Sequence, residues 1–335
     1  TGFGGWKTGV TMADVNGDGW LDIYVGRSGD NAYGPSRTNL LFINQQNNSF
    51  KESAINFGLD QSGYTTQTAF MDLDADGDLD AYVLNHNVKE TKYYDVEAGK
   101  SFRDPNVSDR LLINEGGIFR DRTEEWRVKG YTISYGLGVG VADFDKNGLP
   151  DIYVGNDFME SDYFYVNQGG KFEDQLQKRV KHISNFSMGL DIADLDNDGE
   201  LDIYVVDMVA EDHYRQKTNM KSMDLATFQK AIDDGQYYQY MMNTLQWNVG
   251  NGLFSEVGKY AGVTNTDWSW SPLIADFDND GLKDIFVSNG LRKDVRNNDY
   301  VIKLLSYLDS LGRLPDTQKN VQKEIETALD LSLIH

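Results

Sequence analysis

One nine-residue pattern, Asp-x-(Asp/Asn)-x-(Asp/Asn)-Gly-x-x-Asp, occurs five times in this chain, and an apolar triplet follows each copy. The copies, which we call loops 1 to 5, occupy residues 14–22, 72–80, 143–151, 194–202 and 276–284. Such self-similarity indicates a repeat architecture, in which neighbouring units cover each other's faces. The shortest interval, from Asp143 to Asp194, is 51 residues. This length fits a four-stranded β-propeller blade.

A second repeat follows each of the first four loops. In the first unit it consists of an apolar run at 40–44 that ends in Asn44, a polar turn, and Phe50. Apolar runs joined by Gly- or Asn-rich turns are typical of β-hairpins. Each unit therefore has one strand entering the Asp loop, one leaving it and an outer hairpin. In the first unit we expect these strands at 10–13, 21–26, 40–44 and 50–53.

The predicted fold is therefore an all-β propeller of four-stranded antiparallel blades with helical insertions. Residues 1–290 should hold four complete blades and half of a fifth, and 291–335 a helical insertion or tail. Apolar residues with a helical period also predict helices within 209–242, at 301–308 and at 323–331. The chain opens at Thr1 with no segment that resembles a signal peptide. We expect it to be a mature or excised part of a longer protein.

The loops carry the ligand chemistry of calcium, which takes six to eight oxygen atoms from carboxylates, amides and backbone carbonyls. Positions 1, 3 and 5 offer short oxygen side chains, position 7 a carbonyl and position 9 an aspartate, while Gly at position 6 lets the chain reverse. The predicted ligands are Asp14, Asn16, Asp18, Trp20 and Asp22; Asp72, Asp74, Asp76, Asp78 and Asp80; Asp143, Asp145, Asn147, Leu149 and Asp151; Asp194, Asp196, Asp198, Glu200 and Asp202; and Asp276, Asp278, Asp280, Leu282 and Asp284.

The pattern has two alternative interpretations besides a calcium loop. Asp, Asn and Gly also favour turns that bind no metal, but five copies would each crowd three or four carboxylates, which repel one another without a cation. An EF-hand needs a Glu at position 12, where this chain has Val25 and its four equivalents. We therefore predict up to five structural Ca²⁺ ions.

Composition excludes several other functions. The net charge of −22 argues against nucleic acid and anionic membranes as partners. There is no cysteine, so disulfides and thiolate metal sites are excluded. No apolar stretch is long enough to span a membrane, so direct membrane insertion is not expected. The sequence contains no Gly-x-Ser-x-Gly, Walker or His-Glu-x-x-His motif.

The loops, their Asp-Ile-Tyr-Val continuation and the Leu-x-x-Asn…Phe hairpin resemble the FG-GAP/VCBS repeats of integrin-α-type propellers. Residues 214–217 (Tyr-Arg-Gln-Lys), 243–245 (Asn-Thr-Leu) and 266–270 (Thr-Asp-Trp-Ser-Trp) look closer to the cartilage-acidic-protein (ASPIC/UnbV) branch of Bacteroidota-type surface proteins. The resemblance implies a seven-bladed ring and a role in binding or adhesion. It also implies an exported protein at the bacterial cell surface, where it could be attached to the outer membrane.

The strand order places the Asp loops and hairpin turns on one face of the propeller and the large insertions on the other. Function concentrates in loops on a rigid scaffold, so we expect a protein or glycan partner, or a larger surface complex, opposite the calcium. Candidate contacts there are Tyr64, Tyr135, Trp268 and Trp270, for which the alternative is blade-to-blade packing. The competing function is a calcium-dependent polysaccharide lyase or hydrolase, whose base would come from Lys89, His86 or Arg215.

Overall fold

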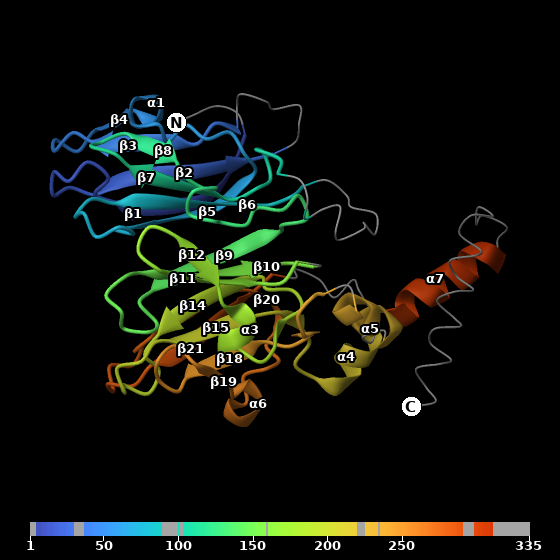
Figure 1. Ribbon diagram of the computed structural model, residues 1–335. Coiled ribbons are helices and arrows are strands. Elements are labelled where there is room, and N and C mark those ends of the chain that lie inside the picture. The colour runs from blue at the N-terminus through green and yellow to red at the C-terminus, as the bar shows by residue number, and fades with distance from the viewer. Residues whose placement is uncertain are drawn as a thin grey trace.

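The computed structural model describes residues 5–29, 37–88, 100, 103–158, 160–219, 225–233, 235–290 and 298–310. Its strands form successive antiparallel sheets arranged as the blades of a propeller (Figure 1). The predicted all-β propeller is thereby confirmed. The described residues contain five blades rather than the seven of the expected ring.

Each of the first four blades has four strands. Blade 1 consists of β1 (Trp6–Ala13), β2 (Asp22–Ser28), β3 (Leu40–Asn44) and β4 (Phe50–Glu52). Blade 2 consists of β5 (Thr65–Met71), β6 (Asp80–Asn85), β7 (Arg110–Asn114) and β8 (Phe119–Asp121). Blade 3 consists of β9 (Gly136–Ala142), β10 (Asp151–Asn156), β11 (Tyr163–Asn167) and β12 (Phe172–Asp174). Blade 4 consists of β14 (Gly189–Ala193), β15 (Asp202–Val206), β18 (Thr244–Asn248) and β19 (Phe254–Glu256).

Blade 5 has three strands in the described residues, and one of them comes from the segment that follows blade 4's second strand. It consists of β20 (Asp267–Ala275), β21 (Asp284–Asn289) and β16 (Met208–Val209), which leaves blade 4 and pairs with the start of β20. A parallel two-stranded sheet pairs β13 (Ile183–Ser184) with β17 (Gln239–Tyr240). The first strands of successive blades, from β1 to β20, contact one another in chain order, as expected for strands that surround a propeller axis.

The short helices α1 (Ala54–Phe57), α3 (Leu176–Arg179) and α6 (Gly258–Ala261) each follow the outer strand of a blade. The insertions form α4 (His213–Asn219), α5 (Leu225–Asp233) and α7 (Asn298–Ser310), which lie together at the right of Figure 1, away from the β1–β2 and β3–β4 turns. The helices predicted within 209–242 and at 301–308 are therefore present. The helix predicted at 323–331 lies outside the described residues. No helix in the described part of the chain has the length and apolar content that a membrane crossing requires.

Apolar faces of neighbouring blades form the core. Between blades 1 and 2, for example, the rings of Tyr24 and Phe70 meet edge to face with centroids 5.6 Å apart. Met12 holds the place in blade 1 that Phe70 holds in blade 2, since each lies one residue before the partner of the position 9 aspartate. Met12 is nevertheless 57% exposed, and Phe286 in blade 5 is also 57% exposed. The face of blade 1 that points away from blade 2, and the face of blade 5 that points away from blade 4, are thus uncovered in this structure.

A buried tyrosine on the second strand of each complete blade binds a polar side chain that precedes the third strand. In blade 2 the hydroxyl of Tyr82 donates to Asp109 Oδ2 at 2.8 Å, and Asp109 Oδ1 accepts the Asn85 N–H at 2.8 Å. Blade 1 has Asn39 at the equivalent place, and its Nδ2 donates to the Tyr24 hydroxyl. Desolvation by burial raises the pKa of Asp109 to about 7.

Replacing Asp109 by Asn should therefore reduce the dependence of stability on pH. The pKa of this carboxyl is 3.8 in the unfolded protein and about 7 in the folded protein. At pH values between these two, the folded state therefore binds more protons than the unfolded state. The free energy of unfolding then falls as pH rises through this window. Urea unfolding in EGTA at about pH 5 and about pH 8 should show a smaller difference in Asp109→Asn than in the parent. The reciprocal Asn39→Asp should enlarge that difference, and equal differences in all three proteins would contradict this explanation.

Candidate metal centres

All five loops adopt one hydrogen-bonded conformation. In loop 1 the carboxylate of Asp14, at position 1, accepts the N–H groups of Asp18 at 3.0 Å and Gly19 at 2.7 Å. The same two bonds recur in loops 2 to 5. The position 5 side chain accepts the N–H of position 7 in every loop. These bonds give all five loops the same turn conformation.

Two residues of each loop have a left-handed backbone. The glycine at position 6 has φ between 85° and 95° in all five loops, as the pattern predicted. Position 4 also has positive φ, including non-glycine residues such as Ala75 at 60° and Lys146 at 57°. The sequence interpretation missed position 4, although Gly17, Asn197 and Asn279 there are residue types that tolerate this conformation.

In blades 1 to 4, the aspartate at position 9 connects the Asp loop to the outer hairpin of its own blade. Asp151 Oδ2 accepts the N–H of Phe144 at 3.2 Å, and its Oδ1 accepts the N–H of Asn167 at 2.8 Å. Equivalent pairs of bonds form in blades 1, 2 and 4. These four aspartates are buried, whereas Asp284 of blade 5 is exposed. Position 9 is therefore a structural clamp as well as a candidate ligand.

Four of the loops bring three carboxylates together with candidate ligand atoms within 4.8 Å of one another. The groups are Asp72, Asp74 and Asp80; Asp143, Asp145 and Asp151; Asp194, Asp196 and Asp198; and Asp276, Asp278 and Asp284. Loop 1 carries Asn16 at position 3 in place of a carboxylate. All of these predicted side-chain ligands lie in the loops that join the first and second strands of the blades, so they share one face.

Crowding of these carboxylates has an electrostatic cost. In loop 2, desolvation and then the charge of Asp76 raise the pKa values of Asp74 and Asp78. Asp78 Oδ1 and Asp145 Oδ1 are buried and have no hydrogen-bond partner among the described residues. Oxygen atoms in this state fit a hard divalent cation, which would both pair with them and relieve the repulsion. That the carbonyls of Trp20, Leu149 and Leu282 complete the coordination stays a prediction.

The aromatic candidates for partner binding are placed differently from one another. Tyr64 and Tyr135 are buried, with the Arg37 guanidinium 4.3 Å from the centre of the Tyr64 ring. Trp268 is partly buried, and Trp270 is 44% exposed. Their role in binding stays a prediction. Of these four side chains, Trp270 offers the most surface to a partner.

Phe158 is an exposed aromatic residue that the sequence interpretation missed. It follows β10, at the end of the strand opposite loop 3, and is 53% exposed with φ of 65°. A bulky residue with positive φ is uncommon. Its ring lies 5.6 Å from that of Tyr135 and 5.5 Å from that of Phe186. An aromatic residue four positions after the Asp-Ile-Tyr-Val segment was the available signal.

The candidate catalytic bases lie in different parts of the propeller. His86 follows β6 of blade 2 and its ring contacts Tyr135. Arg215 lies in α4 and forms an ion pair with Asp267 of blade 5. Lys89 lies outside the described residues.

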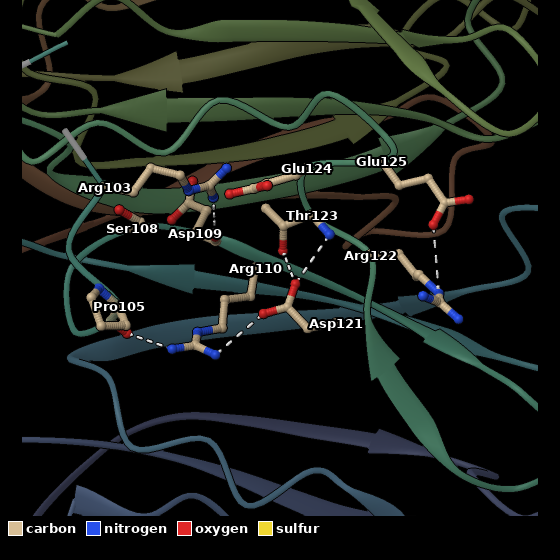
Figure 2. A pocket seen from close by; sticks show the side chains of 10 residues that line it. All are labelled: Arg103, Pro105, Ser108, Asp109, Arg110, Asp121, Arg122, Thr123, Glu124 and Glu125. Carbon is tan, nitrogen blue, oxygen red and sulfur yellow. Dashed lines mark hydrogen bonds and ion pairs between the residues drawn. The ribbon is translucent and has the colours of Figure 1, made fainter. Parts of the chain in front are cut away.

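A pocket of about 560 Å³ lies beside blade 2 (Figure 2). Its lining residues are Arg103, Pro105, Ser108, Asp109, Arg110, Asp121, Arg122, Thr123, Glu124 and Glu125. Arg110 pairs with Asp121, Arg122 pairs with Glu125 and Glu115, and Arg103 donates to backbone carbonyls. The positive groups of this pocket are therefore already engaged within the protein.

Comparison with solved structures finds distant likenesses. An Agrocybe aegerita lectin that recognises non-reducing terminal N-acetylglucosamine is 18% identical with a TM-score of 0.38, over 83% of this chain and 56% of the lectin. The V. cholerae biofilm matrix protein Bap1 is 15% identical with a TM-score of 0.42, over 85% and 35%. The exotype rhamnogalacturonan lyase YesX is 17% identical with a TM-score of 0.39, over 84% and 45%. The chain thus spans between about a third and just over half the length of these proteins.

A search of curated proteins finds no match to this chain. The profile of the FG-GAP-like repeat family, by contrast, matches residues 14–83, 143–205 and 223–287, which is more than half of the chain. These segments contain all five Asp loops. Together with the repeated loop conformation and the bladed sheets, the match shows that this chain belongs to the family of proteins with FG-GAP-like repeats.

Proposed function

We propose that this chain is a non-catalytic binding module whose propeller is stabilised by up to five structural calcium ions. The observation that carries the metal part is the set of five acidic loops with one conformation, two of which hold buried carboxylate oxygens without partners. Every candidate ligand is an oxygen atom, which suits calcium better than zinc or copper. The forgiving coordination of calcium also fits loops that differ in their number of carboxylates.

The contacts of the loops support a structural role for the metal. Position 9 links each loop of blades 1 to 4 to the third strand of its blade, so a cation at the loop would stiffen both segments. Contacts also run between loops, since Lys146 of loop 3 pairs with Glu200 of loop 4 at 2.6 Å. Asn197 of loop 4 donates to the Gly281 carbonyl of loop 5 at 3.0 Å. Calcium would therefore reinforce contacts between neighbouring blades.

We assign the partner, a glycan or a protein, to the face opposite these loops. The support is two exposed aromatic residues: Phe158 follows β10 at the end opposite loop 3, and Trp270 lies in the first half of β20, which runs toward loop 5. A ring held in a fixed orientation offers apolar area to a sugar or a protein side chain at low entropic cost. The helices α4, α5 and α7 of the insertions lie on the same side (Figure 1).

Replacing Phe158 by Ala should weaken partner binding at least about tenfold and lower the melting temperature only slightly, because the residue is 53% exposed. The measurement is a glycan array in millimolar Ca²⁺, followed by titration of any ligand found. Tyr260→Ala, at an exposed aromatic in α6 on the outer rim, is the matched control and should bind normally. Full binding by Phe158→Ala would contradict this assignment. Formation of unsaturated uronates from an acidic polysaccharide would favour the competing lyase function.

We further propose that a seven-bladed ring covers the open faces of blades 1 and 5, and that the protein is exported to a bacterial cell surface. The uncovered apolar side chains of Met12 and Phe286 support the first statement. The second follows from the resemblance to the cartilage-acidic-protein branch and from loops that suit a calcium-rich exterior. Electron microscopy of the intact protein would count the blades, and cell fractionation would locate it.

A further inference from the structure

The link that follows the outer hairpin of blades 1 to 3 places one side chain against the next blade, whereas the equivalent residue of blade 4 is exposed. Counted from the phenylalanine that begins the fourth strand, this position is Phe57, Trp126, Arg179 and Ala261 in blades 1 to 4. Phe57 and Trp126 belong to the apolar clusters between blades. Blade 3 instead places a guanidinium there, and Arg179 is only 8% exposed.

Arg179 uses its donors to join three segments. Its Nη2 donates to Asp145 Oδ2 of loop 3 at 2.8 Å, and its Nη1 donates to the Asn251 carbonyl at 2.8 Å. Its Nε donates to Gln175 Oε1 at 3.0 Å. Asn251 lies in the hairpin turn of blade 4, so one buried cation connects the metal loop of blade 3 to the next blade. A side chain at position 252 would occupy the space of Nη1, which explains Gly252 beside it.

The contact leaves loop 3 with a distinctive charge balance. Asp145 is position 3 of the loop, and its other oxygen, Oδ1, is buried and free of hydrogen bonds. Loop 3 has Asn147 at position 5, so it carries fewer carboxylates than loops 2, 4 and 5. Among the described residues, the position 3 carboxylate that forms an ion pair is Asp145 of loop 3. A charge-assisted bond to a buried partner is stronger than a neutral one and is screened much less than a bond at the surface.

We infer that Arg179 is a built-in cation that keeps loop 3 ordered without calcium, so that this loop differs from the calcium-dependent loops 2 and 4. The inference rests on the proposed structural role of calcium. Arg179 is a positioning residue in this scheme: it holds Asp145 through Oδ2 and leaves Oδ1 toward the loop. The interface between blades 3 and 4 then persists when calcium is removed.

Hydrogen exchange of the loop amides, measured in millimolar Ca²⁺ and in EGTA, tests the inference. In the parent protein the amides of Gly77 and Gly199 should exchange about tenfold faster after chelation, as expected for sites filled at about ten times Kd. The amide of Gly148 should change much less. In Arg179→Gln the amide of Gly148 should become as calcium-sensitive as the other two. Arg179→Lys keeps the charge and should retain most of the insensitivity.

Each failure has a separate meaning. If the parent's Gly148 responds to chelation as strongly as Gly77 and Gly199, the inference is overturned and the calcium role stands. If Gly148 stays insensitive in Arg179→Gln, the arginine is not the cause and the inference is again overturned. If none of the three amides responds to chelation, the proposed calcium role itself fails. A melting temperature of Arg179→Gln in Ca²⁺ that matches the parent within a few degrees establishes that the variant is folded.

Discussion

Chelation of divalent cations with EGTA should lower the melting temperature of this protein by on the order of 14–28 °C. At ten times Kd, one bound ion adds about 1.4 kcal/mol to the free energy of unfolding, and five ions add about 7 kcal/mol. In a domain of this general size, about 1 kcal/mol shifts the melting temperature by roughly 2–4 °C. The physical reason is that removing the cations leaves close carboxylates, such as Asp74 and Asp78, to repel one another in the folded state.

The measurement is a thermal melt followed by circular dichroism, with matched samples in EGTA, in Ca²⁺ and in Mg²⁺. Millimolar Ca²⁺ should restore the melting temperature. Mg²⁺ should restore much less, because it demands a smaller octahedral site and gives up its water reluctantly. High NaCl is a further control, since general screening of the net charge of −22 would raise the melting temperature without specificity. A melting curve that is the same in EGTA and in Ca²⁺ would remove the basis for structural metal.

The parts of the fold that could be predicted from sequence are those that repeat. The outer hairpin expected at 40–44 and 50–53 is present as β3 and β4. Five copies of the Asp loop, each before an apolar strand, specify the turn between two strands and thereby the blade. The conformation follows from short-range contacts, such as those from Asp14 to Asp18 and Gly19. Local chemistry of this kind is visible in a single sequence.

The parts that could not be predicted depend on contacts between distant residues. The clamp at position 9 of loop 3 joins Asp151 to Asn167, 16 positions away. No local sequence pattern predicts this contact. For Tyr64 the sequence left partner binding and packing between blades both open, and the residue is buried beneath Arg37, 27 positions earlier in the chain. Arg179 reaches Asn251 across 72 positions. Burial and pairing at such separations are set by how the blades stack, which the repeat pattern alone does not describe.

The clamp at position 9 leads to the second large effect, which does not require metal. Asp151→Ala should lower the free energy of unfolding by about 2–6 kcal/mol in EGTA, because the buried N–H groups of Phe144 and Asn167 lose their acceptor, at about 1–3 kcal/mol each. Asp151→Asn keeps one acceptor oxygen and should lose about half as much. Urea unfolding followed by tryptophan fluorescence measures these differences.

Blade 5 provides the matched control, because the described residues of this blade include no outer hairpin. Asp284 holds the same position and accepts the Phe277 N–H at 3.1 Å, but it is exposed, and water can replace its carboxylate. Asp284→Ala should therefore cost less than about 1 kcal/mol in EGTA. In Ca²⁺ both variants should lose one metal site, so the extra loss on adding Ca²⁺ should be similar in the two. Small losses for both variants in EGTA would mean that position 9 acts through the metal alone, and equally large losses would mean that burial of the aspartate does not decide its effect. A large loss for Asp151→Ala and a small one for Asp284→Ala would identify the aspartate as the bond that joins each metal loop to its blade.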